Sequence, residues 1–213
     1  MEELNREFDG KLDTCIQIFK GTYHKKFLHQ LVSSQLDMDR LDYLNRDSFF
    51  TGVAEGTVGS DRIIKMLDVV NDEIVVLEKG IYSIEKFLLA RRLMYWQVYL
   101  HKTVLSAENL LVNMLRRARY LSENGTELYA STALRFFLEG RYEVKDGFKN
   151  VALRDAFAGL DDYDIFASAK EWMNHSDPIL KELSTRLIQR KLLRIQLDNQ
   201  PFSKEKVEAL QKA

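Results

Sequence analysis

The spacing of apolar residues predicts that most of this chain is helical. Apolar residues recur at intervals of three and four over long stretches, and the chain has only two prolines, Pro178 and Pro201. The predicted fold class is mainly α, a compact helical bundle with one long central helix. The expected helices are residues 12–19, 23–31, 37–50, 61–67, 83–120 as one very long helix or two in line, 128–139, 150–174 with a break near Gly159, 177–193 and 203–211.

One short segment has the pattern of strands instead. In DVVNDEIVVLEKG, pairs of β-branched residues flank Asn71 and Asp72 as strands flank a hairpin turn, so we expect one small hairpin over residues 69–76. No repeat, linker or low-complexity tract divides the chain. We therefore expect a single domain over residues 1–213, with N-terminal helices in 1–50, a loop and the hairpin in 51–80, and a helical bundle in 81–213.

Composition and charge exclude several classes of partner. Of the 213 residues, 46% are hydrophobic, which is enough for a sizeable core, and 31 basic residues almost balance 32 acidic ones. No long stretch carries one sign of charge, so neither a nucleic-acid nor a membrane surface is expected. No apolar run approaches a membrane span, and MEELNREFDG lacks the features of a signal peptide. We expect a soluble, cytoplasmic protein whose single cysteine, Cys15, is a buried thiol.

The densest polar cluster on an apolar helix is DMDRLDYLNRD. Asp39, Tyr43 and Asp47 are spaced four apart and therefore share one helix face, while Leu41 and Leu44 face the core. Spacing alone leaves two interpretations open. These charges form either ordinary surface ion pairs or a polar site.

The longer segment SSQLDMDRLDYLNRDSFFTGV favours the polar site. It closely resembles the helix that supplies the final metal-binding aspartate in HD-domain hydrolases of the deoxynucleoside-triphosphate triphosphohydrolase group. The resemblance implies an HD-domain-like bundle in which residues 1–50 form the metal and substrate region. By position, it makes Asp39 a metal ligand, turns Arg40 toward the substrate phosphates, and gives Tyr43 and Asp47 to the sugar. Asp42 and Arg46 point away from that face and are expected to be structural.

A second stretch, ARRLMYWQVYLHKT, places Arg91, Tyr95, Tyr99 and Lys102 on one stripe of a helix. Aromatic residues at this spacing are often core, but two cations on the stripe favour a polar surface. The resemblance extends here and to LDDYDIFASAKEW, and it covers the chain to about Arg194. It implies that Arg91 contacts the phosphates and that Tyr99 packs against the sugar. Whether His101 and Lys102 face a nucleotide or a subunit interface stays open.

The chain departs from that family at the metal site. The family is named for a histidine–aspartate dipeptide, which this sequence lacks, and the resemblance places three other ligands before the segment that corresponds to Met1. His24 and His29 are five residues apart, so they do not share a helix face and do not replace those ligands. We expect the chain alone to be inactive and to hold no metal tightly, whereas the complete family enzyme uses a divalent metal of the Mg, Mn or Fe class.

Two function hypotheses follow. In the first, the chain is part of a metal-dependent phosphohydrolase that binds deoxynucleoside triphosphates and releases nucleoside and triphosphate. In the second, it is a non-catalytic helical module, a degenerate or short-form paralogue, that binds nucleotides or mediates oligomerisation. The family resemblance also implies a homo-oligomer. Walker, GxSxG, CxxC and HExxH motifs are absent, which leaves other hydrolase chemistries unsupported. The preferred base, the metal and any allosteric nucleotide stay open.

Overall fold

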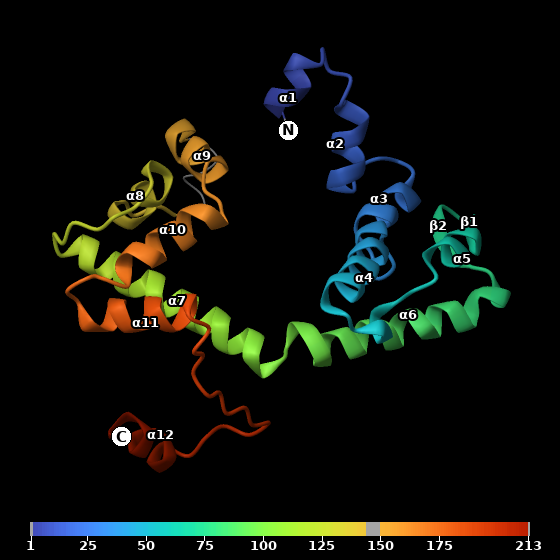
Figure 1. Cartoon of the computed structure of the whole chain (residues 1–213). Coiled ribbons are helices and arrows are strands. Elements are labelled where there is room, and N and C mark those ends of the chain that lie inside the picture. The colour runs from blue at the N-terminus through green and yellow to red at the C-terminus, as the bar shows by residue number, and fades with distance from the viewer. Residues whose placement is uncertain (1, 144–149, 213) are drawn as a thin grey trace. The chain divides into compact units, whose positions relative to one another are not determined.

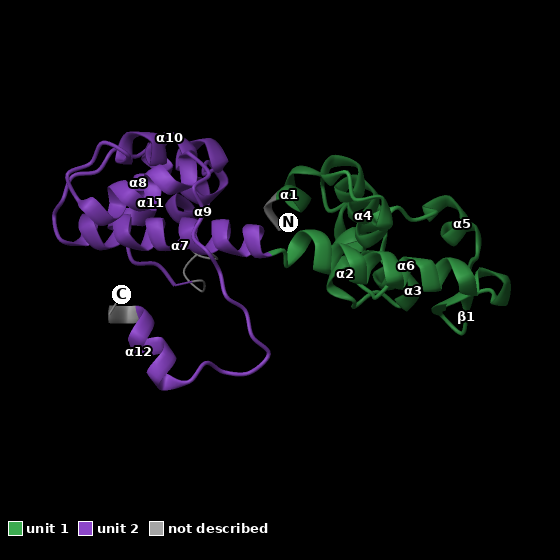
Figure 2. Cartoon of the chain, turned by 60° about the horizontal axis from the view of Figure 1, so that its bottom comes forward, with its two compact units in different colours: residues 1–101 green, residues 102–213 purple. Residues whose placement is uncertain are grey.

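The computed structural model describes residues 2–143 and 150–212, and it confirms a mainly α fold with one small hairpin (Figure 1). The chain divides into two compact units, residues 1–101 (the first unit) and 102–213 (the second unit) (Figure 2). Whether the two units act as the single domain expected from the sequence stays a prediction. Among the described helices, none is both long enough and apolar enough to cross a membrane.

The first unit is built around the contact between α4 and α6. α4 also packs against α3, and α5 packs against α6. The core at this contact is formed by buried apolar residues of these helices and of the loop between them: Leu41, Leu44, Val58, Ile63, Phe87, Ala90 and Met94. The elements of this unit are α1 (Glu2–Glu7), α2 (Asp13–Lys20), α3 (Lys26–Val32), α4 (Met38–Thr51), η1 (Ala54–Gly56), α5 (Ser60–Lys65), β1 (Leu67–Val70), β2 (Glu73–Val76), η2 (Glu78–Gly80), α6 (Ile81–Met94) and η3 (Tyr95–Tyr99).

The hairpin forms where the sequence predicts it. β1 and β2 pair antiparallel, with Leu67 opposite Val76 and Val70 opposite Glu73. The two turn residues, Asn71 and Asp72, have φ of 51° and 65°, the left-handed conformation that a two-residue hairpin turn requires at both positions. Asn and Asp tolerate this conformation better than most residues, which explains why this turn does not need glycine.

The second unit packs α11 against α7 and α10, and α8 against α7 and α9. Its core surrounds Trp172, which is 1% exposed and donates a hydrogen bond from Nε1 to the carbonyl of Tyr129 at 2.9 Å. Asp177 caps α11 and Pro178 takes the first helical position, as the sequence predicts. The elements are α7 (Lys102–Glu123), α8 (Thr132–Glu139), α9 (Val151–Ala158), α10 (Asp162–Trp172), α11 (Pro178–Ile188) and α12 (Lys204–Lys212).

Of the two alternatives expected for residues 83–120, one very long helix or two helices, the structure has two helices. α6 ends in the π-helical turn η3, and α7 begins only at Lys102. Two other expectations need correction. The helix expected over 177–193 ends at Ile188, where Arg190 adopts a positive φ of 56°. Cys15 is exposed because α2 turns Ile16 inward instead. The helix α1 was not predicted.

Candidate functional site

The start of α4 is fixed by a buried carboxylate. Asp37 is 5% exposed and caps the helix by accepting a hydrogen bond from the backbone N–H of Arg40 at 2.8 Å. The Arg40 guanidinium returns to the same carboxylate and also donates to the carbonyl of Ser34. Arg40 therefore stabilises the N-terminal end of α4, and its Nη1 atom already donates hydrogen bonds to Asp37 and Ser34.

The middle of α4 is held by polar side chains to the loop that follows it. Asn45 accepts from the backbone N–H of Val58 at 2.8 Å and donates to the Ser60 hydroxyl at 2.7 Å. Ser48, which is buried, donates to the carbonyl of Val53 at 2.7 Å. These bonds satisfy backbone groups of an irregular segment, which would otherwise lose hydrogen bonds on burial. They fix the orientation of α4 and therefore of its polar face.

On that face, the structure brings together residues that are far apart in sequence. The Tyr99 hydroxyl donates a hydrogen bond to Oδ2 of Asp47 at 2.6 Å, joining η3 to α4. The ring of Tyr99 meets the ring of Tyr43 edge-on, with centroids 6.3 Å apart, and the ring of Tyr95 at 5.2 Å. We call Tyr43, Tyr95 and Tyr99 the tyrosine cluster. Edge-to-face contacts of this kind add stability beyond burial alone.

Burial and charge keep the phenols of this cluster protonated. Desolvation, followed by the hydrogen bond to Asp47, raises the pKa of Tyr99 well above its ordinary value. Desolvation also raises the pKa of Tyr43, and the negative charge of an ionised Tyr95 would raise it further. Both phenols are therefore hydrogen-bond donors throughout the neutral pH range. Among the described residues, no hydrogen-bond partner of the Tyr43 hydroxyl is found, so this donor is available to a ligand.

Positive charge adjoins the tyrosine cluster. Arg91 lies 5.9 Å from the centre of the Tyr95 ring and donates from Nη1 to the Gln35 side chain at 3.2 Å. Arg91 and Arg40 both act to lower the pKa of Tyr43, against the larger effect of burial, so both guanidinium groups are within electrostatic range of that phenol. The arrangement combines two arginine side chains with phenol donors and a carboxylate acceptor, and guanidinium groups are suited to pairing with carboxylate or phosphate oxygens.

Asp39 stands apart from these contacts. Its side chain is exposed in the first turn of α4, and within residues 2–143 and 150–212 no hydrogen bond or ion pair of its carboxylate is found. The neighbouring pair Asp42 and Arg46 forms an exposed ion pair one helical turn apart, which agrees with the structural role expected for both. Of the three residues predicted to share this face, Tyr43 and Asp47 are connected through their contacts with Tyr99, and Asp39 is not.

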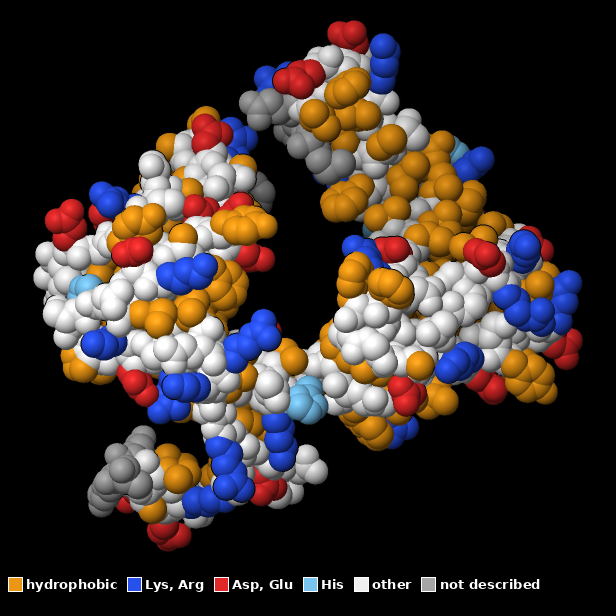
Figure 3. Space-filling model, viewed as in Figure 1, with side chains coloured by type: hydrophobic (Ala, Val, Ile, Leu, Met, Phe, Trp, Pro, Cys, Tyr) orange, Lys and Arg blue, Asp and Glu red, His pale blue; other side chains and the backbone are white. Residues whose placement is uncertain are grey.

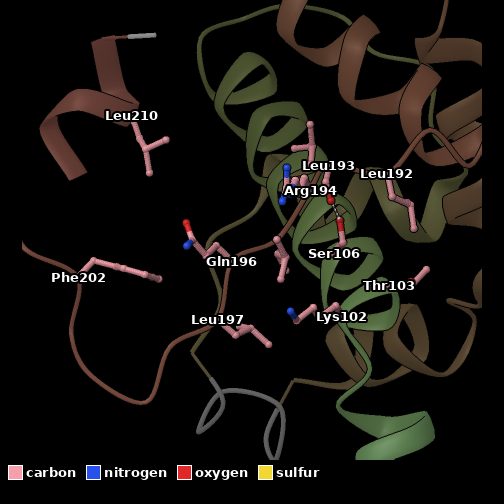
Figure 4. A pocket seen from close by; sticks show the side chains of 11 residues that line it. Lys102, Thr103, Ser106, Leu192, Leu193, Arg194, Gln196, Leu197, Phe202 and Leu210 are labelled. Atoms are coloured by element: carbon pink, nitrogen blue, oxygen red, sulfur yellow. Dashed lines mark hydrogen bonds between the residues drawn. The ribbon is translucent and has the colours of Figure 1, made fainter. Parts of the chain in front are cut away.

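The stripe predicted from Arg91 to Lys102 holds only in part. Arg91, Tyr95 and Tyr99 are in sequential contact, but Lys102 is the first residue of α7 and belongs to the second unit. There Lys102 lines an open cavity of about 1150 Å³ together with Arg194 and apolar side chains such as Phe202 and Leu210 (Figure 4). Ser106 at its base donates to the carbonyl of Leu193 at 2.6 Å.

Sequence reasoning missed the residues that support the site. Asp37, Asn45 and Gln35 act through bonds to the backbone or to Arg91, and no spacing pattern distinguishes them from ordinary polar residues. For Asp37 a signal did exist, because a polar residue directly before an apolar-periodic stretch is typical of an N-cap. Tyr95 was noted on the stripe, but its contacts with Arg91 and Tyr99 depend on the turn that ends α6.

Comparison with known proteins places similar sequences and structures beside this chain. A family model, the HD associated region, matches residues 58–136. The solved structure of a phosphohydrolase from Bacteroides thetaiotaomicron VPI-5482 is similar, with 52% identity and a TM-score of 0.95 over 98% of this chain and 52% of that one. The uncharacterized protein YwfO of Bacillus subtilis is 34% identical over 178 residues, 83% of this chain and 39% of YwfO.

A shorter likeness connects the chain to a protein with a stated activity. Over 108 residues it is 30% identical to the deoxynucleoside triphosphate triphosphohydrolase SAMHD1 homolog of Dictyostelium discoideum, across 47% of this chain and 21% of that protein. The chain spans about two fifths of YwfO and about half of the Bacteroides phosphohydrolase. The HD associated region and the likeness to HD-domain proteins support a place for this chain in the HD superfamily.

Proposed function

We propose that this chain is the substrate-side part of a metal-dependent phosphohydrolase that converts deoxynucleoside triphosphates to deoxynucleoside and triphosphate. The observation that carries the proposal is the 2.6 Å hydrogen bond from Tyr99 to Asp47, with Tyr43 against the same ring. Half-buried phenols and a carboxylate suit the hydroxyl and the flat faces of a sugar, because each lost hydrogen bond would leave a partly buried group unpaired.

In this proposal each residue has a defined task. Asp47 accepts a hydrogen bond from the 3′-hydroxyl, the free hydroxyl of Tyr43 donates to the sugar, and the ring of Tyr99 packs against it. Arg91 and Arg40 pair with the phosphates. Both guanidinium groups already act on Tyr43, which supports a phosphate position next to the sugar position. The likeness to a protein named as a deoxynucleoside triphosphate triphosphohydrolase gives independent support.

The described residues do not by themselves fit a catalytic metal ion. In the parts of the chain that the structure describes, no three His, Cys, Asp or Glu side chains are grouped so that they could hold one. A catalytic site needs about three protein ligands in fixed geometry, and Asp39 would supply one hard oxygen ligand. We therefore derive no step through a metal, and we assign to this chain the binding and orientation of the nucleotide.

The 213-residue chain itself should release no triphosphate from a mixture of the four deoxynucleoside triphosphates with Mg²⁺ or Mn²⁺. It should also retain no stoichiometric metal after dialysis, because Asp39 alone cannot hold a divalent cation against water. Product analysis and elemental analysis measure the two quantities. Turnover together with stoichiometric metal would show that the ligand assignment is wrong.

In an enzyme that carries the complete ligand set, Asp39→Ala should abolish hydrolysis and leave the fold unchanged. The Asp39 side chain is exposed, whereas Leu41 and Leu44 are the buried apolar side chains of α4. Packing of the core therefore does not depend on the Asp39 carboxylate. The matched control is Asp42→Ala, three residues away and also exposed, which should leave hydrolysis unchanged. An exchange of the two phenotypes would contradict the assignment of faces on α4.

A second candidate function, a non-catalytic module that binds nucleotides or mediates homo-oligomerisation, is supported by the apolar surface of the first unit. Phe49 and Phe50 at the end of α4 are 78% and 79% exposed, and hydrophobic side chains also gather over the N-terminal helices (Figure 3). Sedimentation at increasing concentration should then show self-association that Phe49→Ser combined with Phe50→Ser weakens. A monomer at every concentration would contradict this candidate's oligomeric form.

A further inference from the structure

We propose that Tyr99 is a positioning residue, which the π-helical turn η3 directs at Asp47 so that Asp47 presents a single oriented oxygen to the ligand. The proposal rests on the proposed function for the identity of that ligand. It goes beyond the packing role that the resemblance implies for Tyr99, because it assigns the effect to the hydroxyl and not to the ring.

The turn itself is defined by its backbone bonds. The N–H of Leu100 donates to the carbonyl of Tyr95 at 2.8 Å, five residues back, where an α-helix would use a carbonyl four residues back. Such turns are rare inside helices and are frequent at functional sites. This one has no proline or glycine to cause it, so tertiary contacts on either side must hold it.

Those contacts are found on both sides of the turn. Met94 directly precedes it, is fully buried in the core with Leu44, and lies against Gly56, where a side chain would collide with its sulfur atom. Tyr99 closes the turn and packs against the same core while bonding to Asp47. In a continuous α-helix, residues five apart point about 140° away from each other. Met94 and Tyr99 face the same core because the π turn accommodates the additional residue.

The carboxylate of Asp47 has two oxygens that can accept hydrogen bonds, and Tyr99 occupies one of them. Oδ2 accepts from Tyr99, and the charge-assisted bond fixes the rotation of the whole group. The other oxygen, Oδ1, is left to accept from a ligand hydroxyl in one direction. A side chain held in advance loses less entropy on binding, so the hydroxyl of Tyr99 should increase affinity without touching the ligand.

Tyr99→Phe separates this role from packing, since the ring and its contacts with Tyr43 and Tyr95 remain. We would measure binding of each 2′-deoxynucleoside triphosphate and of its 2′,3′-dideoxy analogue to the 213-residue chain by calorimetry. The preference for the 3′-hydroxyl should fall by roughly tenfold, as we also expect for Asp47→Asn. The double variant should be no worse than Asp47→Asn alone. An unchanged preference in Tyr99→Phe, or fully additive losses, would overturn the positioning role.

A second measurement needs no ligand and therefore stands if the proposed function fails. Tyrosinate absorbance at 295 nm is followed from pH 8 to about pH 11.5 for the chain and for Tyr99→Phe. The two curves should coincide, because a phenol held by Asp47 does not ionise there, whereas a free phenol titrates near pH 10. A tyrosine missing from the curve of the variant would contradict the bond.

The role of the turn is tested by exchanging two residues, Val98→Tyr with Tyr99→Val. Position 98 is four residues after Met94, where a continuous α-helix would direct its side chain at α4. In the structure Val98 is partly buried against the same core, and it is Tyr99 that bonds to Asp47. We expect the moved phenol, which Asp47 no longer holds, to ionise at a lower pH than Tyr99 does, and the 3′-hydroxyl preference to be lost. If the moved phenol stays protonated to pH 11.5, the π turn does not set the direction of Tyr99. Circular dichroism of the exchanged chain confirms that it is folded.

Discussion

The two units of this protein use polar side chains in different ways. In the second unit, the buried polar side chains include the small hydroxyls of Ser106, Ser168 and Ser184. The apolar core there surrounds Trp172, and the ion pair of Arg117 with Asp177 fixes the start of α11. In the first unit, a smaller apolar core borders directly on Asp37, Asn45 and the tyrosine cluster. Burying a polar group costs free energy unless the group is hydrogen-bonded. Proteins tend to keep such groups beside a core at functional sites. Under the proposed function, the first unit carries the site and the second unit supports the structure.

The largest expected effect is a loss of stability in the second unit, caused by a substitution far in sequence from the candidate site residues. Trp172→Ala removes a side chain that is 1% exposed and should lower the free energy of unfolding by about 3–5 kcal/mol, because it leaves a cavity and an unpaired carbonyl at Tyr129. Urea denaturation followed by circular dichroism measures this. Phe157→Ala is the control, since that ring is 72% exposed and its loss should matter little. Equal losses in the two variants would contradict the core assignment.

A smaller effect concerns the pH dependence of the second unit. The hydrogen bond from Arg117, at 2.5 Å, lowers the pKa of Asp177 to about 2. A carboxyl with a depressed pKa stabilises the fold fully above its unfolded pKa, near 4, and loses that contribution as the pH falls toward 2. The loss should be about 1–2 kcal/mol, because solvent partly screens the pair.

Asp177→Asn sharpens that measurement. Asparagine caps a helix as well as aspartate does, so the variant keeps the bond to the N–H of Leu180. It loses the charge and the hydrogen bond that Oδ2 accepts from Arg117. Its unfolding free energy should therefore vary less between pH 5 and pH 2 than that of the parent chain. The same slope in both chains would show that other carboxylates determine the acid sensitivity of the second unit.

The smallest effect is expected on the outer face of α4. Asp42→Ala breaks an ion pair with Arg46 whose two side chains are both more than half exposed, so the free energy of unfolding should change by less than about 0.5 kcal/mol. Nucleotide affinity should not change. Thermal unfolding and calorimetry on the same sample test both statements. A large loss of nucleotide affinity in Asp42→Ala would show that the ligand contacts the face of α4 that we assign to solvent.

Much of the fold could be predicted because its signals are local. The Asn71–Asp72 turn, the Asp177–Pro178 helix start and the periodicity of α4 depend on residues close in sequence. The end of α6 could not be predicted, because no glycine or proline marks it and its apolar spacing also suits a continuous helix. The boundary between the units has no distinctive composition either. Cys15 was misplaced because its apolar neighbours do not determine which helix face is buried.

The candidate site was predictable to the same extent. The common face of Tyr43 and Asp47 follows from spacing, and the residues named beside it came from a family resemblance. The bond between Asp47 and Tyr99 joins positions 52 residues apart, so only the packing of α6 on α4 produces it. Arg40 was expected to face phosphates, and its engagement with Asp37 and Ser34 depends on the bend before α4. Long-range contacts of this kind are not encoded in any local pattern.

The central claim is that Asp47 in the first unit accepts a hydrogen bond from the 3′-hydroxyl of a sugar. The ratio of two dissociation constants tests this claim most directly. Calorimetry gives the Kd of a 2′-deoxynucleoside triphosphate and of its 2′,3′-dideoxy analogue, for the 213-residue chain and for Asp47→Asn. The parent chain should prefer the 3′-hydroxyl by roughly tenfold, the worth of one hydrogen bond to a charged group, and the variant should show nearly no preference. A preference that is unchanged by Asp47→Asn, with only stability reduced, would mean that Asp47 and Tyr99 form a structural pair and that the sugar is bound elsewhere.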